Sequence, residues 1–463
     1  MKTKKILFVF LVLSLLSCNY VTQMVVPLTP TPIPMLTATS TPSPIPSPTP
    51  TQLVPAYIPP QCSASPLATL SPETAIQINS QPETNPEISQ SEQLRILAKV
   101  GRIVREVYVY PDYNGKNWTE IESRYRTKIE AGLDAESFYH EMMSMIAELQ
   151  DDHSAFITPE EVAQTTAELK GDVKFVGVGI YGLPDFQKED ITVVSTFPGS
   201  PAEYADIQSH DSILLVDGLP ITSEGGSRLR GPECSAVVLE VQSPGGAPRN
   251  VMLLRSQVEG NVPIEARLVH TTDGSKIGYI FIPSFFDETL PLQIEDALNH
   301  FGPLDGLILD VRLNGGGSSS VAYPILGFFT NGRLGQFVSR EESRPLVIKG
   351  NSIQNSQTVP LAVMVSKDTV SFGEIFAGIL RDARGAKVTG ETSLGNVELL
   401  HGYDLEDGSM LWIAAEKFYS AFSDIDWEET GIVPDVQAYA PWDTFSFDAD
   451  PSIAAAVGLL GHK

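Results

Sequence analysis

The hydrophobic pattern changes its period along the chain and so divides it into regions. Apolar residues recur at helical spacing over Leu94–Val107 and again over Phe138–Leu149, which places them on one face of each helix. Asp134 precedes the second run and suits the N-cap position of a helix. We therefore expect a small helical domain over residues 91–170, with these apolar stripes forming its core.

The next region contains short β runs separated by glycine and proline. The runs are Phe175–Ile180, Ile191–Val194 and Ile213–Val216, and a Gly-Ser-Pro-Ala-Glu motif begins at Gly199. Short runs of this kind, with turn residues between them, predict a β domain, which we place at residues 171–260.

The third region alternates predicted strands with predicted helices. The strands are Ile277–Ile282, Leu307–Val311, Leu361–Val365 and Lys387–Thr389, and the helices are Leu290–Phe301 and a segment after Ser371. Alternation of this kind predicts βαβ units around a mostly parallel, buried sheet. We expect a catalytic core at residues 261–445, followed by a C-terminal tail at 446–463. The predicted fold class is multidomain α+β.

The first 90 residues carry different signals. Lysines at positions 2, 4 and 5 precede the apolar run Ile6–Leu16, which is too short to span a bilayer comfortably. Ser17 and Cys18 follow this run directly. This pattern resembles a lipoprotein signal peptide, residues 1–18, in which Cys18 is acylated. The alternatives are an ordinary signal peptide or an uncleaved anchor. Residues 19–90 are rich in Pro, Thr and Ser, which predicts a disordered linker.

Composition narrows the choice of partners. The formal net charge is −26, which argues against nucleic acid because phosphate binding needs a basic face. Two cysteines follow Cys18, namely Cys62 and Cys234. In an exported chain they can form a disulfide, and the sequence leaves open whether they do.

Two loops that follow predicted buried strands carry candidate chemistry. Asp310–Gly317 ends in three consecutive glycines, which allow a tight turn with exposed N–H groups suited to an anion or an oxyanion hole. Ser371 stands where a helix begins, and the helix dipole there favours developing negative charge. The alternatives are an ordinary turn and an ordinary N-cap serine. No Gly-x-Ser-x-Gly motif occurs, which disfavours an α/β-hydrolase.

Taken together, these motifs resemble the C-terminal processing and tricorn-core serine peptidases. The resemblance rests on Asp-x-Arg-x-Asn-x-Gly-Gly from Asp310, Ser-x-x-Glu-Ile from Ser371 and Gly-Ile-Val-Pro-Asp from Gly431, in this order. It implies a βαβ core like those of crotonases and ClpP. It also implies that Ser371 is the nucleophile, with Gly316 and the N–H of Phe372 forming the oxyanion hole.

The chain departs from the Ser–Lys branch of this family. The position of the catalytic lysine is occupied by Asn396, and the position of its supporting glutamine by Leu400. Asparagine is not a base at any relevant pH, so a lysine mechanism is not expected.

The tricorn branch uses Ser, His and Glu, and the resemblance places its histidine at His153 and its glutamate at Glu428. A neutral imidazole is a suitable base near pH 7. Several alternatives remain open. His153 could be structural, Glu428 could be a solvated carboxylate, His401 is a rival base, and loss of the lysine is also what an inactive relative would show.

The β domain resembles the PDZ domains that are embedded in bacterial proteases. There, a loop like Val176, Gly177, Val178 and Gly179 receives the C-terminal carboxylate of a peptide while the peptide adds a strand to the sheet. The alternative is a PDZ fold kept only for architecture.

From these features we expect an exported serine endopeptidase of the cell envelope, tethered to the outer face of a membrane by a lipid. Its partners are protein or peptide substrates, and no metal or cofactor is needed. The competing hypothesis is a catalytically inactive peptidase fold that captures peptide C-termini or serves as a scaffold.

Overall fold

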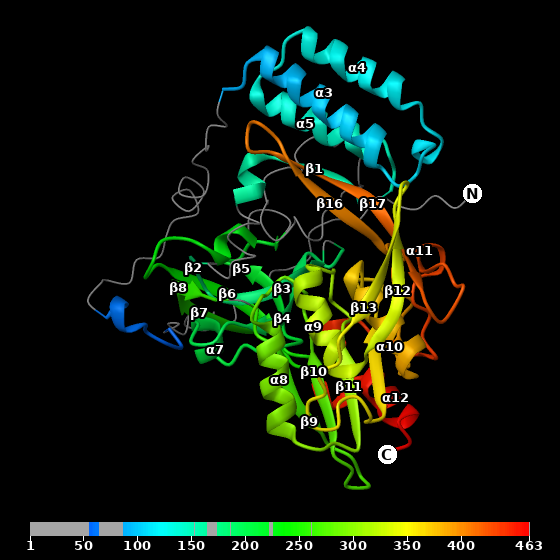
Figure 1. Ribbon diagram of the computed structural model, residues 1–463. Helices are drawn as coiled ribbons and strands as arrows, with labels where there is room; N and C mark the ends of the chain where they lie inside the picture. Colours follow the sequence, from blue (N-terminus) through cyan, green and yellow to red (C-terminus); the bar gives the residue numbers. More distant parts are fainter. Residues whose placement is uncertain are drawn as a thin grey trace, which may run out of the picture.

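A computed structural model describes residues 55–63, 87–151, 153–163, 174–185, 187–221, 226–260 and 262–462. The polypeptide forms three regions, namely a helical region, an inserted β domain and a core around a mostly parallel sheet (Figure 1). The predicted signal peptide with Cys18, and most of the predicted linker, lie outside the described residues. Within the described part, no helix is long and apolar enough to cross a membrane.

Three helices form the upper part of the molecule in Figure 1. They are α3 (Gln90–Val107), α4 (Trp118–Glu130) and α5 (Ala135–Ala147). The Asp134 side chain caps α5 by accepting a hydrogen bond from the Ser137 N–H, as the sequence predicts. The sequence did not predict α4, whose apolar positions are interrupted by charged residues. The helices share a core with strands of the long sheet below them, including Leu411 and Ile413.

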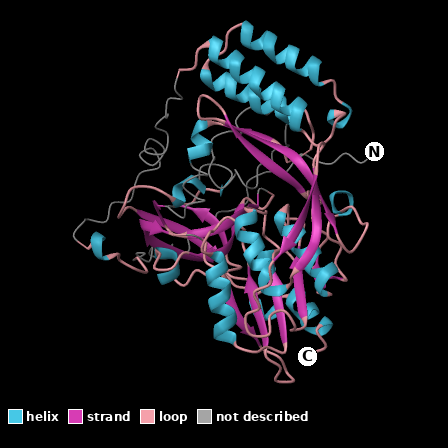
Figure 2. Ribbon diagram, viewed as in Figure 1, coloured by secondary structure: helices cyan, strands magenta, loops and turns pink. Residues whose placement is uncertain are grey.

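That long sheet links the helices to the rest of the chain (Figure 2). Its strand order is β1-β17-β12-β13, and β16 also pairs with β17. The strands are β1 (Ala155–Ile157), β12 (Gly332–Val338), β13 (Ser343–Ile348), β16 (Glu398–Asp404) and β17 (Met410–Ser420). Because β1 pairs with β17, the segment just before β1 lies beside strands that come more than 240 residues later in the chain.

The inserted β domain has a five-stranded antiparallel sheet in the order β3-β4-β5-β6-β7, and a separate pair of β2 with β8. These strands are β2 (Lys174–Gly177), β3 (Ile180–Asp185), β4 (Asp190–Thr196), β5 (Ser212–Val216), β6 (Ala236–Gln242), β7 (Arg249–Leu254) and β8 (Ser256–Glu259). Its helices are short, namely α7 (Pro201–Tyr204) and the 3₁₀ turn η4 (Gly226–Leu229). The buried apolar residues of these elements form a hydrophobic core that belongs to the β domain alone.

The core region contains a six-stranded sheet in the order β18-β15-β14-β11-β10-β9. All its neighbouring pairs are parallel except β10 with β9, as expected from the βαβ pattern. The strands are β9 (Glu265–Val269), β10 (Ile277–Phe281), β11 (Gly306–Asp310), β14 (Leu361–Val365), β15 (Lys387–Gly390) and β18 (Val436–Gln437).

Helices cover both faces of this sheet. One face packs against α8 (Leu290–Phe301), α9 (Ser319–Phe329) and α10 (Phe372–Arg384). The other face packs against α12 (Pro451–Leu459) and part of the β domain, including Val194. Residues 446–463, which we expected as a tail, therefore contribute α12 to the hydrophobic core through Ile453 and Val457. The remaining short elements are α11 (Trp427–Thr430) and the 3₁₀ turns η1 (Pro60–Cys62), η2 (Tyr113–Gly115), η5 (Trp442–Thr444) and η6 (Phe447–Ala449).

The segment 55–63, which lies in the predicted linker, is held on the β domain. Cys62 and Cys234 form a disulfide with a Cα–Cα distance of 5.2 Å. The Ala56 N–H donates a hydrogen bond to the carbonyl of Met252 on β7, and the rings of Tyr57 and Tyr204 are stacked 4.0 Å apart. The question that the sequence left open is therefore settled in favour of pairing.

Candidate active site

Ser371 lies between β14 and α10, at the N-cap position of the helix. Its backbone has φ 55° and ψ −124°, a conformation that non-glycine residues rarely adopt and that costs free energy unless the surroundings enforce it. The surroundings do so here, because the Ser371 N–H donates hydrogen bonds to the carbonyl of Asn396 at 2.9 Å and to Glu374 Oε2 at 3.2 Å. The next residue, Phe372, is the first of the helix, where an N–H has no acceptor within the helix.

The glycine loop after β11 lies directly against Ser371. A Cβ on Gly316 would be 2.8 Å from Ser371 Cβ and 3.2 Å from Ser371 Oγ, so only glycine fits beside the hydroxyl. The buried Asn314 side chain accepts a hydrogen bond from the Gly316 N–H at 2.9 Å. In this structure the Gly316 N–H, which we expected in the oxyanion hole, is therefore engaged by Asn314.

A buried ion-pair network supports the glycine loop from the other side. Arg312 donates to Asp310 at 2.7 Å and to Asp450 at 2.6 Å, and Tyr279 Oη donates to Asp310 at 2.7 Å. The Arg312 guanidinium also lies 4.6 Å from the centre of the Trp442 ring. Buried charges that are paired in this way fix the geometry of their surroundings.

Glu374, in the first turn of α10, is hydrogen-bonded to the loop that carries Asn396. Its carboxylate accepts hydrogen bonds from Ser393 Oγ and the Gly395 N–H at 2.6 and 2.7 Å, and from the Asn396 N–H at 2.8 Å. Burial raises the pKa of Glu374 to about 7, against the effect of these donors. Glu374 is the glutamate of the Ser-x-x-Glu motif, for which the sequence alone predicted no role. The capping-box spacing was the available signal.

His153 lies in the turn that leads into β1. Asp151 Oδ1 accepts hydrogen bonds from the His153 N–H at 3.0 Å and the Ser154 N–H at 2.8 Å, and Ser154 Oγ accepts one from the Ala414 N–H on β17. The turn is thereby fixed to the long sheet. His153 Nδ1 is 3.6 Å from Glu398 Oε2. No direct hydrogen bond joins the His153 ring to the Ser371 hydroxyl in the described part of the chain.

The structure places Glu398, rather than Glu428, beside the imidazole. Glu428 is nevertheless close, because its carboxyl group interacts with that of Glu398 and accepts a hydrogen bond from the Val397 N–H at 2.7 Å. Sequence reasoning missed Glu398. The available signal was a glutamate in the otherwise apolar run 397–400.

The segment Asn396–Glu398 therefore joins the parts of the site. The Asn396 carbonyl binds the Ser371 backbone, and two residues later the Glu398 side chain faces His153. Two residues of extended chain span at most about 7 Å. The rival base His401 lies farther along β16 and pairs with Glu416 at 2.9 Å.

The residues expected to bind a peptide carboxylate lie in and just after β2. The Val178 N–H donates to the carbonyl of Leu229 at 3.1 Å, and the carbonyl of Val176 accepts from the Gly231 N–H. Gly177 forms a bridge with Arg230, and the Gly179 carbonyl accepts from the Phe197 N–H. The Val178 donor is therefore already used within the domain.

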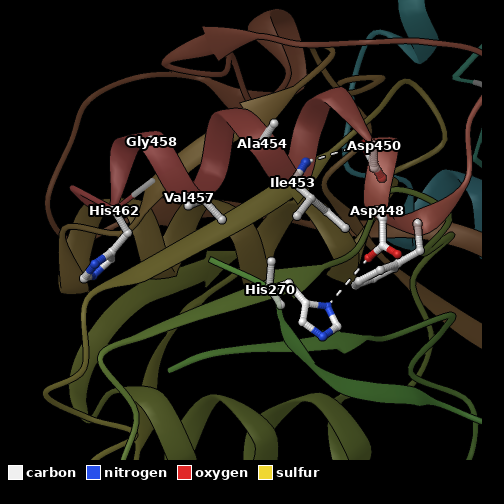
Figure 3. Close-up of a pocket in the computed structure, with 10 residues that line it drawn as sticks. His270, Asp448, Asp450, Ile453, Ala454, Val457, Gly458 and His462 are labelled. Atoms are coloured by element: carbon white, nitrogen blue, oxygen red, sulfur yellow. Dashed lines mark hydrogen bonds and ion pairs between the residues drawn. The ribbon is translucent and has the colours of Figure 1, made fainter. Parts of the chain in front are cut away.

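A cavity of about 390 Å³ lies between β9 and α12 (Figure 3). Its walls include Val269, Ile453 and Val457, and the side chains of His270 and His462 stand at its edge. Asp450, the partner of Arg312, is among its lining residues, whereas Ser371, His153 and Glu398 are not.

Comparison with known proteins finds peptidase domains and peptidase relatives. Residues 276–438 match the model of peptidase family S41, and residues 90–147 match the tricorn protease C1 domain. A carboxyl-terminal-processing protease of Synechocystis is 27% identical over 381 residues, covering 80% of this chain and 87% of the relative. The chloroplastic carboxyl-terminal-processing peptidase 2 of Arabidopsis thaliana is 29% identical over 371 residues, covering 76% of this chain and 70% of the relative.

A solved structure of a peptidase is also similar to this chain. That of a photosystem II D1 C-terminal processing protease is similar with a TM-score of 0.52 and 25% identity, covering 76% of this chain and 93% of that chain. The family match and these relatives indicate a serine peptidase with a mixed α/β architecture. Residues 276–438 therefore carry a peptidase family S41 domain, and residues 90–147 carry a tricorn protease C1 domain.

Proposed function

We propose that this protein is an exported serine endopeptidase that cleaves protein or peptide substrates through Ser371 and His153, without a catalytic lysine. The observation that carries the proposal is the segment 396–398, which contacts the Ser371 backbone at one end and faces His153 at the other. Asn396, in the lysine position, cannot accept the serine proton. Catalytic hydrogen bonds are often long in unliganded enzymes and shorten when substrate binds.

The reaction is an acyl transfer. His153 accepts the proton of Ser371 as Oγ attacks the scissile carbonyl, and then donates it to the leaving amine. The Phe372 N–H stabilises the oxyanion, together with the Gly316 N–H once this donor exchanges Asn314 for the substrate. Water then cleaves the acyl-enzyme with His153 as the base.

The proposal includes how substrates are recruited and where the enzyme acts. The β domain captures a peptide C-terminus in the manner of a PDZ domain. β3 supports this, because it is the edge strand of its sheet and has one hydrogen-bonded strand neighbour among the described strands. Acylation of Cys18 anchors the enzyme to the outer face of a membrane, and the Cys62–Cys234 disulfide is consistent with an oxidising, exported environment.

The deciding experiment uses a fluorophosphonate probe and a fluorogenic peptide on the wild type and on the variants Ser371→Ala, His153→Ala and Lys417→Met. Ser371→Ala should abolish labelling, and His153→Ala should lower kcat by roughly 10⁴-fold. Lys417→Met should retain activity, although its Nζ lies near this region, 4.1 Å from the Tyr110 ring centre. Amidating the C-terminus of the peptide should raise KM.

Two results would contradict the proposal. Wild-type protein that binds peptide but never labels would make this a binding protein built on a peptidase fold. Loss of activity in Lys417→Met with full activity in His153→Ala would assign the base to a lysine after all.

A further inference from the structure

The carboxylate that faces His153 belongs to a residue outside the expected triad. Glu398 is the first residue of β16 and its side chain is 1% exposed. Its Oε2 atom and His153 Nδ1 are both buried and have no hydrogen-bond partner among the described residues, yet they are only 3.6 Å apart. A buried carboxylate oxygen without a partner is costly, so a small closing movement of the two groups is favoured.

The other oxygen of Glu398 is firmly held. Oε1 accepts a hydrogen bond from Tyr110 Oη at 2.5 Å. The Tyr110 ring is in turn covered by Lys417 Nζ at 4.1 Å from its centre, and Lys417 is the register partner of Glu398 across the β16–β17 pair. The hydrogen bond from Tyr110 orients the carboxylate plane with Oε2 toward the imidazole.

Glu428 has a different environment and a different protonation state. Two carboxyl groups can hydrogen-bond to each other only if one of them carries a proton. Burial, and then the hydrogen bond and charge of Glu398, raise the pKa of Glu428. Burial alone would raise the pKa of Glu398, but the neighbouring His153, Glu428 and Tyr110 side chains outweigh it and lower this pKa. Because Glu398 faces His153 and accepts a hydrogen bond from Tyr110, the negative charge is favoured on Glu398 and the proton on Glu428.

We propose that Glu398 is the carboxylate that positions His153 and stabilises its imidazolium form, and that Glu428 is a neutral hydrogen-bond donor that holds Glu398 in place. This assignment rests on the proposed function and specifies the positioning group for the same site. During acylation the serine proton moves to His153 and on to the leaving amine, and neither carboxyl group exchanges a proton with the substrate. Glu428 binds the Val397 N–H, so it also fixes the strand that carries Glu398.

The charged and titratable groups around this pair come from several elements. His153 approaches from the turn before β1, Tyr110 from the segment after α3, Lys417 from β17, and Glu374 acts on Glu428 from α10. Asp151 also acts on Tyr110 through its charge. Of these groups, only His153 and Lys417 are basic.

The chemistry of the two carboxyl groups gives an asymmetric test in the full-length protein. Glu398→Gln removes the negative charge that faces the imidazole, so kcat on a fluorogenic peptide should fall by roughly 10²- to 10⁴-fold with KM little changed. Glu428→Gln replaces one neutral donor by another. Its amide can still donate to Glu398 and accept from the Val397 N–H, so kcat should stay within about tenfold of the wild type.

The pH profile separates positioning from a merely structural role. In Glu398→Gln the acid limb of kcat/KM should move to lower pH, because an amide no longer stabilises the positive charge on the ring. In Glu428→Gln the limb should stay where it is in the wild type. Glu416→Gln is the matched control, because it removes another buried glutamate that pairs with a histidine, His401, on the same hairpin, and it should leave the acid limb unchanged.

The outcomes are decisive in both directions. A smaller loss of kcat in Glu398→Gln than in Glu428→Gln, or an acid limb that does not move in Glu398→Gln, overturns the assignment. Should Glu398→Gln fail to fold, Glu398→Asp keeps the charge and must keep the wild-type acid limb. Failure of the proposed function is distinguishable, because wild-type protein would then not label at Ser371, and the assignment would fall with it.

Discussion

The positive φ of Ser371 and the absence of a side chain at Gly316 depend on each other. The strained backbone turns the hydroxyl toward the glycine loop, and a Cβ at position 316 would occupy the space beside it. Strain of this kind persists only where neighbouring contacts enforce it, and here the backbone of Asn396 and the carboxylate of Glu374 do so.

Gly316→Ala should therefore reduce catalysis more than stability. The new Cβ must displace Ser371, and a displacement approaching 1 Å costs roughly 100-fold in kcat. Gly332→Ala is the matched control, because Gly332 has a similar positive φ of 97° with nothing within 4 Å of its added Cβ. Both variants should lose about 1 kcal/mol from backbone strain, measured by thermal unfolding. Equal kcat values in the two variants would contradict this account.

At the scale of elements, the start of α10 and the loop 393–396 are joined by one buried carboxylate. Glu374 accepts hydrogen bonds from backbone donors on both segments. If a glutamine replaced Glu374, its side-chain amide N–H groups would point at backbone N–H groups that now donate to the carboxylate. Ser371 and the strand that leads to Glu398 therefore share a single anchor.

Glu374→Gln should destabilise the fold by roughly 2 kcal/mol at pH 7 or above, because it leaves buried donors unpaired, and should lower kcat. The difference from the wild type should depend on pH. The pKa of Glu374 is raised to about 7 in the folded chain, so its contribution to stability is complete below the unfolded pKa and declines as the pH rises toward 7. The destabilisation, measured by urea unfolding, should therefore be larger at pH 4.5 than at pH 7.5.

The exposed Glu288→Gln should show no such change. A wild-type-like pH profile for the stability of Glu374→Gln would mean that this carboxyl group is ionised in the folded chain throughout this range.

Local patterns predicted much of the architecture but only part of the site. The strands around Leu307–Val311 and Leu361–Val365 have continuous apolar runs, and the α5 helix has a clear cap, so their places were predictable from sequence alone. The long sheet was not, because β1 joins β17 across more than 250 residues, and no local period reports such pairing. Glu398 was missed for the same reason, since its role depends on which turn packs against β16.

At the scale of the whole molecule, an aromatic contact of His210 near the glycine loop helps to dock the β domain on the core. The His210 ring is stacked on Trp442 at 4.5 Å, and its Nδ1 is hydrogen-bonded to the Trp442 carbonyl at 2.7 Å. Arg312 also lies near this ring. Lys188 adds an ion pair to Asp443 at 2.7 Å. The position of the β domain is thus connected to the residues that support the active site.

Acidification should loosen this docking. Burial lowers the pKa of His210, so its contribution to stability is present above the ordinary histidine range and is lost as the pH falls through the lowered pKa. Between pH 7.5 and 5, tryptophan fluorescence of the wild type should show a transition that His210→Asn lacks, because the asparagine amide keeps the bond to Trp442 without titrating. His270→Asn, at an exposed position, should behave like the wild type. Identical transitions in His210→Asn and the wild type would contradict this.

The disulfide between Cys62 and Cys234 closes a covalent ring whose two cysteines are 172 positions apart. A nick anywhere between them leaves the two pieces joined. A protease that cuts the chain between Cys62 and α3 therefore cannot by itself release the enzyme from a membrane anchor. For a chain held at a membrane by Cys18, release into solution then requires either a cut ahead of the ring or a reductant as well as a cut.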